Sequence, residues 1–433
     1  MKRASFLSLA ALLAAGVTPA SAQAKVGGLV QVWWNLTTPS EFRNNSTTLN
    51  TLAGGRSYYN LRSEFKENGF AIRRVELKFS GKIVDDVEYE AMIDPSISPS
   101  TTNSILQDAS ITWKSPLGLD IKMGQMKAFQ TYEGLNSSSE LLTVERSQMG
   151  RTIGDVRQRG VAAIYGFGDV KDLAGKVVLG AFNGDVKVND SNAQKDFVAR
   201  VEFQAAKDHK FGVYTLQGQT NLNDKDSSPL QSRTWTGAAP APAALDVVGN
   251  KDKTSHLGAF YVFQTSDLHL SAEYVAGTLG RGYGIASTAS LVNAAQGANQ
   301  TAYSATAAAR EHLDQKFMGL VLTGAYTTGN HTFVARWDSM NYNQGDKWYT
   351  AANPYKVNVT AANGSTGVAD FTPKYTELTV GYLYAFKPES LKAANFKLNY
   401  IARSKNVLAP NTLSNQTSEQ GGNTLVAAFQ VAF

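Results

Sequence analysis

Short segments in which apolar and polar residues alternate recur along the whole chain. Each is about ten residues long, and a period of two places successive side chains on opposite faces of a β-strand. An even number of tilted strands of this length can close into a barrel that crosses a bilayer. The pattern predicts sixteen strands, at 28–35, 70–83, 86–94, 105–114, 119–126, 159–166, 176–183, 196–205, 209–218, 255–264, 267–276, 313–326, 331–340, 374–386, 395–403 and 423–433.

The connections between these segments alternate in length. Short links fall at 84–85, 115–118, 206–208, 265–266, 327–330 and 387–394, with 167–175 slightly longer, and mostly long polar segments lie between them, at 36–69, 127–158, 219–254, 277–312, 341–373 and 404–422. Outer-membrane barrels have short periplasmic turns and long extracellular loops. A β-sandwich, which also has one polar face, gives no reason for this sorting. We therefore predict an all-β chain that forms a transmembrane antiparallel β-barrel.

Both ends of the chain agree with export to the outer membrane. Lys2 and Arg3 precede an apolar run at 6–17, and small residues follow at 20–24, which is the pattern of a secretory signal peptide cleaved after position 22 or 24. The barrel domain would then span 23–433. The final segment ends on Phe433 with apolar residues at every second position, and it resembles the C-terminal assembly signal of bacterial outer-membrane barrels.

Charged residues share one register within the predicted strands. Arg74 and Lys78, for example, alternate with Val75, Leu77 and Phe79. A charge facing lipid costs up to ~2–4 kcal/mol at the midplane, so these groups need water inside the barrel. Aromatic residues near strand ends are expected in the interfacial girdles, namely Trp33, Trp34, Trp113 and Tyr382. By parity Arg73 faces outward near the extracellular rim, where it is a candidate for binding lipopolysaccharide phosphates.

The segment 127–158 is expected to control passage. Its apolar side chains need burial, and Ser137 precedes a short predicted helix as a cap. The next strand carries little bulk on its predicted inner face, at Gly160, Ala162 and Ile164, which leaves room for a loop folded into the lumen. A barrel of sixteen strands is otherwise a wide aqueous channel, so such a loop sets the constriction.

Several motifs between about residues 60 and 185 resemble the phosphate-selective porin O/P family. They are FAIRRVELKFSGK, the GQMK of 124–127, the triplet Glu145-Arg146-Ser147, Arg151 with Gly154, and Arg159-Gly160-Val161. The resemblance implies a trimeric porin of sixteen strands whose third loop folds into the lumen and whose basic residues guide anions.

Basic residues of the inner wall and of the loop are the candidate pore-lining set. They are Arg74, Lys78, Lys122, Lys127, Arg146, Arg151, Arg157, Arg200 and Arg336. Such residues in a narrow lumen can replace part of an anion's hydration shell. For Arg146 and Arg151 the alternative is pairing with Glu145, Asp155 or wall carboxylates, which would hold the loop in place. Acidic residues are almost as numerous in the loop region, so only a mild anion preference is expected.

The composition narrows the chemistry further. The chain has no Cys, which excludes disulfides, thiolate metal sites and Cys nucleophiles. Its five His form no close pair, so no metal or cofactor is predicted. The net charge of +5 is spread without a basic run, so nucleic-acid binding is not expected.

We predict a bacterial outer-membrane porin, not an enzyme, for passive diffusion of small hydrophilic solutes with a mild preference for phosphate-like anions. Its expected partners are membrane lipid, lipopolysaccharide, small anionic solutes and two further copies of the chain. One alternative is a porin for neutral or sugar solutes, with Tyr132 and Phe129 forming an aromatic slide. The other is an enzyme or adhesin that uses the barrel as an anchor.

Overall fold

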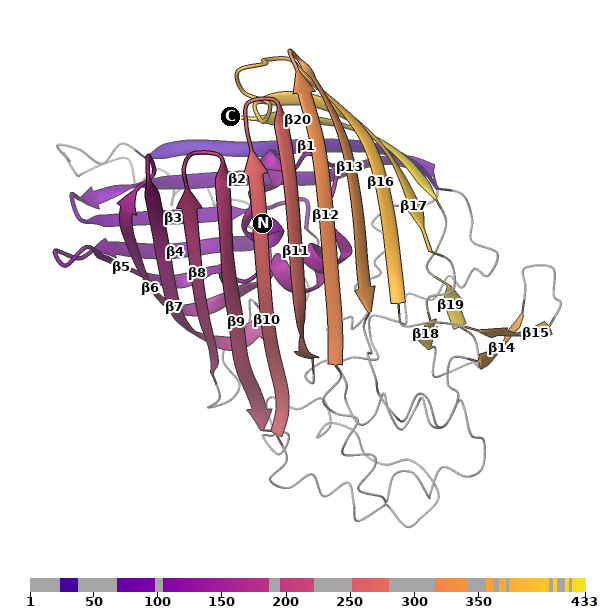
Figure 1. The fold of residues 1–433 in the computed structure, drawn as a ribbon, viewed down its shortest axis with the longest axis horizontal. Coiled ribbons are helices and arrows are strands. Elements are labelled where there is room, and N and C mark those ends of the chain that lie inside the picture. Colours follow the sequence, from indigo (N-terminus) through magenta and orange to yellow (C-terminus); the bar gives the residue numbers. More distant parts are fainter. Residues whose placement is uncertain are drawn as a thin grey trace, which may run out of the picture.

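The computed structural model describes residues 24–37, 68–97, 104–186, 195–221, 251–279, 316–341, 356–360, 366–370, 374–404, 408–410, 417–419 and 423–433. Sixteen antiparallel strands pair with their neighbours in chain order, and the last strand pairs with the first, so the sheet closes into a barrel (Figure 1). The barrel strands are β1 (Lys25–Thr37), β2 (Asn68–Val84), β3 (Val87–Ile93), β4 (Leu106–Lys114), β5 (Leu119–Lys127), β6 (Arg157–Asp169), β7 (Leu173–Val186), β8 (Asp196–Ala205), β9 (His209–Asn221), β10 (Lys251–Gln264), β11 (Leu268–Leu279), β12 (Lys316–Thr328), β13 (His331–Asn341), β16 (Lys374–Ala385), β17 (Ala394–Arg403) and β20 (Thr424–Ala432).

The predicted barrel of sixteen strands is confirmed, and each predicted segment overlaps one barrel strand. The link predicted at 167–175 is wrong in extent, because β6 and β7 continue pairing up to Asp169 and Leu173. Two short hairpins were not predicted. They are β14 (Lys356–Thr360) with β15 (Thr366–Asp370), and β18 (Leu408–Pro410) with β19 (Thr417–Glu419).

The predicted signal peptide lies outside the described residues, as do most of the long connections. The signal peptide therefore stays a prediction. Within the part of the chain that the structure describes, no helix has the length and apolarity needed to cross a membrane.

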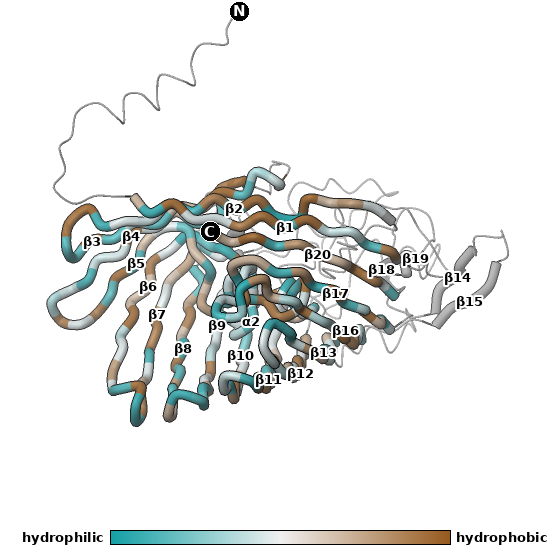
Figure 2. The backbone as a smooth tube through the Cα atoms, turned by 90° about the horizontal axis from the view of Figure 1, so that it is seen from above, coloured by the Kyte–Doolittle hydropathy of each residue, from teal (hydrophilic) through white to brown (hydrophobic). Residues whose placement is uncertain are grey.

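The two faces of the barrel wall follow the predicted parity, and the alternation of polar and apolar residues is visible along the strands in Figure 2. On the last strand, Phe429 and Val431 are more than half exposed on the outer face, whereas Val426 and Gln430 are buried on the inner face. Trp113 also lies exposed on the outer face. Because apolar side chains cover the outside, this surface suits acyl chains.

Two expectations about β1 and β2 are wrong. Trp33 is 1 % exposed and faces the lumen, in the same register as Gln31, instead of lying in an outer girdle. Arg73 is the extra residue of a β-bulge, because Gln31 pairs with Arg74 while Val32 pairs with Ile72. A bulge lets two consecutive residues face one side of a strand. The Arg73 side chain accordingly turns inward, where its guanidinium contacts Glu145.

The hydrophobic core lies inside the lumen, where the long segment between β5 and β6 packs against the barrel wall. This segment contains α2 (Tyr132–Leu135), a 3-10 turn η2 (Ser138–Glu140) and a π-helical turn η3 (Gly150–Gly154). Each of three clusters of buried apolar residues combines residues of this segment with residues of the barrel strands. The inner face from β7 to β20 is therefore partly apolar, which the sequence analysis did not predict.

Candidate functional site

The segment 128–156, which we call the lumen loop, leaves the wall and returns to it at one point. The backbone N–H of Ala128 donates to the carbonyl of Val156 over 3.1 Å, so the two ends of the loop meet. Phe129 has φ 50°, a conformation that costs a non-glycine residue free energy, and it turns the chain inward. Its ring packs near Phe182 of β7. Thr131 then caps α2 by accepting from the N–H of Gly134 over 2.9 Å.

Two glycines allow the two helical turns of the lumen loop to touch. A Cβ on Gly134 would lie 2.2 Å from the carbonyl carbon of Gly154, and a Cβ on Gly154 would lie 1.9 Å from Thr131 Oγ1. Neither position has room for a side chain. The compact shape of the loop therefore depends on glycine at both places.

The helix predicted after Ser137 is only partly confirmed. Ser137 caps the 3-10 turn at 138–140, and its hydroxyl accepts from the N–H of Ser139. Leu141 and Leu142 lie beyond this turn. The helix α2 comes earlier than predicted, and the π-helical turn at 150–154 was missed.

Apolar contacts hold the lumen loop against the wall. Met149 and Ile153 pack into a cluster with residues of β9 to β16, including Phe260 and Val275. Val144 packs against Trp33 and against residues of β17 and β20. All residues from 143 to 150 are buried. The loop is therefore part of the core and not a strand connection lying in open water.

Asp155 is the centre of a cluster of positive charges. Arg146 contacts one carboxylate oxygen at 3.0 Å, while Lys127 and Arg157 contact the other at 3.1 and 3.3 Å. Burial alone would raise the pKa of Asp155, but the charges of Arg146, Lys127 and Arg157 outweigh it and hold this pKa well below its ordinary value. Asp155 therefore stays ionised and holds both ends of the lumen loop together.

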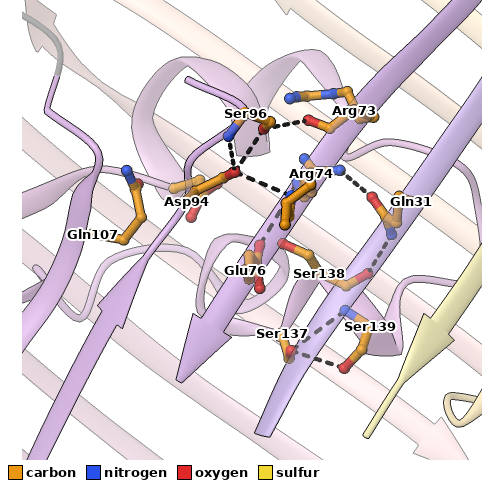
Figure 3. A network of polar contacts seen from close by, with 12 residues as sticks. Gln31, Arg73, Arg74, Glu76, Asp94, Ser96, Gln107, Ser137, Ser138 and Ser139 are labelled. Atoms are coloured by element: carbon orange, nitrogen blue, oxygen red, sulfur yellow. Dashed lines mark hydrogen bonds and ion pairs between the residues drawn. The ribbon is translucent and has the colours of Figure 1, made fainter. Parts of the chain in front are cut away.

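Glu145 connects the lumen loop to β2. Its carboxylate accepts from Arg73 at 2.6 Å and from Arg74 at 2.8 Å, and Glu145 itself is 2 % exposed. Arg74 also donates to Gln31 of β1 over 2.8 Å, and Gln31 in turn donates to the carbonyl of Ser138 (Figure 3). Two strands and two parts of the loop therefore share one hydrogen-bonded network.

Two arginines from other strands, Arg336 of β13 and Arg200 of β8, also contact the loop. Arg336 Nη1 lies 3.1 Å from Glu133 and also donates to the hydroxyl of Thr143 and the carbonyl of Glu145. Arg200 donates to the carbonyl of Gln130 and forms an ion pair with Glu202.

Arg151 of the lumen loop and Arg157, the first residue of β6, are also paired with the wall. Arg151 contacts Glu377 of β16 at 2.9 Å, and Arg157 contacts Asp108 of β4 at 3.0 Å. Both arginine side chains are more than nine-tenths buried. Arg146 contacts Asp155, and Arg151 contacts Glu377. These pairings favour the alternative in which Arg146 and Arg151 hold the loop in place.

Lys78 and Lys122 differ from the other predicted residues because they remain accessible to water. Lys78 is 45 % exposed and pairs with Glu90, whereas the half-buried Lys122 has no side-chain partner among the residues that the structure describes. Lys176 and Lys210 lie in the same inward register, and sequence reasoning missed them. Their alternation with the apolar residues Leu179, Phe211 and Val213, which lie exposed on the outer face, was a signal that could have identified them.

Tyr132 and Phe129, the expected aromatic slide, both serve to pack the lumen loop. The ring of Tyr132 stacks on Phe260 with a centroid distance of 5.1 Å. Burial raises the pKa of Tyr132 above its ordinary value. The two rings therefore contact different parts of the wall and do not form a continuous row.

A cavity of about 430 Å³ lies between the lumen loop and the wall of β10 to β13. It extends from Arg336 to the turn that connects β10 and β11, which contains Asp267. Among the described residues there is no group of three or more His, Asp or Glu arranged to hold a metal ion. The cavity is of a size that can hold a small solute.

Comparisons with known proteins agree with this geometry. A family model described as phosphate-selective porin O and P matches residues 54–433. The outer-membrane channel DcaP of Acinetobacter baumannii is similar in structure, with a TM-score of 0.53 and 13 % identity over 96 % of this chain and 99 % of that one. OmpT of Vibrio cholerae, in its trimer form, has a TM-score of 0.48 and 9 % identity over 95 % and 100 % of the two chains. An anion-selective porin from Comamonas acidovorans has a TM-score of 0.48 and 10 % identity over the same shares. No curated protein matched the sequence.

Proposed function

Because the chain belongs to the phosphate-selective porin O and P family and is an outer-membrane porin, we propose that it favours small hydrophilic anions during passive diffusion. The family and the fold are those of a channel rather than an enzyme. The preference would arise on the inner wall near the short turns, which face the periplasm in such barrels.

The observation that carries this proposal is an excess of lysine on that part of the wall. We call these residues the lysine arc. It consists of six lysines, of which five contact a total of four carboxylates and the sixth, Lys122, contacts none among the described residues. The carboxylates are Glu88, Glu90, Asp120 and Glu202, and the lysines are Lys78, Lys82, Lys114, Lys122, Lys176 and Lys210.

The ion pairs within the lysine arc leave an excess of positive charge. Glu202 is contacted by Lys176, Lys210 and Arg200 together, and Lys122 has no acidic partner among the described residues. Surplus positive charge in a confined aqueous space raises the local concentration of anions. The buried loop arginines contribute less, because each faces a carboxylate.

Reversal potentials of the reconstituted protein in a KCl gradient test this proposal. We expect wild type to favour Cl⁻ and Lys122→Gln to reduce that preference. Lys387→Gln, at an exposed lysine in the turn after β16, is the matched control and should leave it unchanged. A preference for K⁺ in wild type would overturn the proposal, as would an equal effect of both substitutions.

We further propose a homotrimer embedded in lipid and lipopolysaccharide, as the family resemblance implies. The exposed apolar outer face supports the lipid contact. Light scattering of the detergent-solubilised protein tests the assembly, and a mass of one copy would contradict it.

A further inference from the structure

The cavity between the lumen loop and β10 to β13 is lined by two charged groups of opposite sign that keep unused hydrogen-bonding atoms, the Nη2 group of Arg336 and the carboxylate of Asp267. We propose that it binds short zwitterionic peptides, with the peptide carboxylate at Arg336 and the peptide ammonium group at Asp267. This inference does not depend on the anion preference of the lysine arc. It requires only that the barrel conducts.

Arg336 supplies the positive group at the inner end of the cavity. Its side chain is 3 % exposed, and three partners take their hydrogen bonds from Nη1. The Nη2 group donates no hydrogen bond to any residue that the structure describes. The Nε group lies 3.4 Å from Asp338 Oδ2, so Nη2 is the nitrogen of this guanidinium that is left for a solute. A carboxylate is the group that a guanidinium binds best.

Asp267 supplies the negative group at the outer end. It lies exposed in the turn between β10 and β11, where its backbone carbonyl accepts from Thr327. Its carboxylate has no partner within the described part of the chain. An ammonium group of a bound solute would reach it directly from the periplasmic side.

The other acidic residues that line the cavity are already occupied. Glu133 accepts from Arg336 and Ser147, Glu273 accepts from Tyr214 at 3.0 Å, and Glu140 pairs with Lys392. They therefore compete little for a solute's ammonium group. Arg336 and Asp267 together favour a solute that carries one negative and one positive charge.

The separation of the two groups sets the length of the solute. Arg336 pairs with Thr323 in the sheet, and Thr327, next to Asp267, lies four residues further along β12. Four residues of a strand span about 14 Å. An extended peptide of about four residues covers the same distance. A single amino acid is too short to reach both ends.

The wall between the two ends is suited to a peptide chain. The hydroxyl of Thr323 is not engaged by any described residue, so it is available to the peptide backbone. Leu141, Leu268 and Val321 provide apolar surface for small side chains. A volume of about 430 Å³ lies within the range of pockets that enclose small ligands.

Block of the KCl current through the reconstituted full-length protein tests the proposal. Tetra-alanine is added to the periplasmic side and compared with N-acetyl-tetra-alanine and with tetra-alanine amide, which each lack one terminal charge. We expect tetra-alanine to block with an apparent Kd about fivefold or more below that of either derivative. These comparisons leave the protein unchanged, so they do not disturb the contacts of Arg336 with the loop.

Asp267→Asn provides the matching change in the protein. It should weaken block by tetra-alanine about fivefold and leave block by the N-acetyl derivative unchanged. Equal block by all three peptides, or no block while KCl current is normal, would overturn the proposal. An absence of any KCl current would instead contradict the channel function itself, so the two failures are distinguishable.

Discussion

Arg74 Nη2 lies 2.8 Å from Glu145 Oε1, which joins the wall of the barrel to a loop residue 71 positions later in the chain. Glu145 also accepts from Arg73, and all three groups lie inside the lumen. Removing a buried acid that faces two arginines leaves their charges without a partner. The Glu145 carboxylate therefore contributes much of the free energy that holds the lumen loop against β2.

Glu145→Gln should release the lumen loop from β2. Breaking such a buried pair costs ~3–5 kcal/mol, which raises the population of undocked loop about 100-fold or more. We expect faster trypsin cleavage at Arg146 and Arg151 and a larger single-channel conductance. Glu140→Gln is the control within the same loop, because Glu140 is 48 % exposed and pairs only with the exposed Lys392. Equal behaviour of the two variants would contradict the role of Glu145.

Gly154→Ala should loosen the loop by a different route. The added methyl group would meet Thr131 Oγ1 at 1.9 Å, and overpacking of this kind costs ~1–3 kcal/mol. Trypsin cleavage within 128–156 should become faster, while the barrel itself stays folded. Gly324→Ala is the control, since its nearest contact is Leu270 at 3.5 Å. Unchanged protection of the loop in Gly154→Ala would show that α2 and η3 do not depend on this contact.

The pH dependence of the loop follows from Asp155. Because its pKa in the folded protein lies below the ordinary value of 3.8, its stabilising effect is present above that value and is lost as pH falls through the folded pKa. The difference in single-channel conductance and in trypsin resistance between wild type and Asp155→Asn should therefore be constant from about pH 8 to about pH 4. Asp155→Asn should loosen the loop at neutral pH. A transition between about pH 5 and pH 7 in wild type that Asp155→Asn abolishes would contradict this assignment.

The strand pattern was predictable because the membrane and the lumen impose a period of two on nearly every strand. Arg73 was assigned to the wrong face because a bulge shifts the register of β2 by one residue. No residue type in this part of the sequence indicates the bulge. The pairs Arg151–Glu377 and Arg336–Glu133 join residues more than 200 positions apart. Pairings at such separation depend on how the loop docks, so alternation alone cannot identify them.

One part of the site did leave a signal in the sequence. Stretches such as FMGLVL at 317–322 are apolar in both registers. A strand that is apolar on both faces is covered on both. On β12 the inner residues Phe317 and Val321 are indeed buried with Met149 of the lumen loop. The apolar inner wall therefore marked the surface on which the loop docks.

A single thiol at Ser137 tests whether the lumen loop lies in the path of solutes. The chain has no Cys, so Ser137→Cys carries the only reactive site. Ser137 is exposed, whereas Ser147 is fully buried and Ser147→Cys serves as the unreactive control. Labelling Ser137→Cys with a bulky, charged methanethiosulfonate reagent should lower the single-channel conductance, since the label would occupy the lumen. Complete labelling with unchanged conductance would place the loop outside the conducting path and contradict the account.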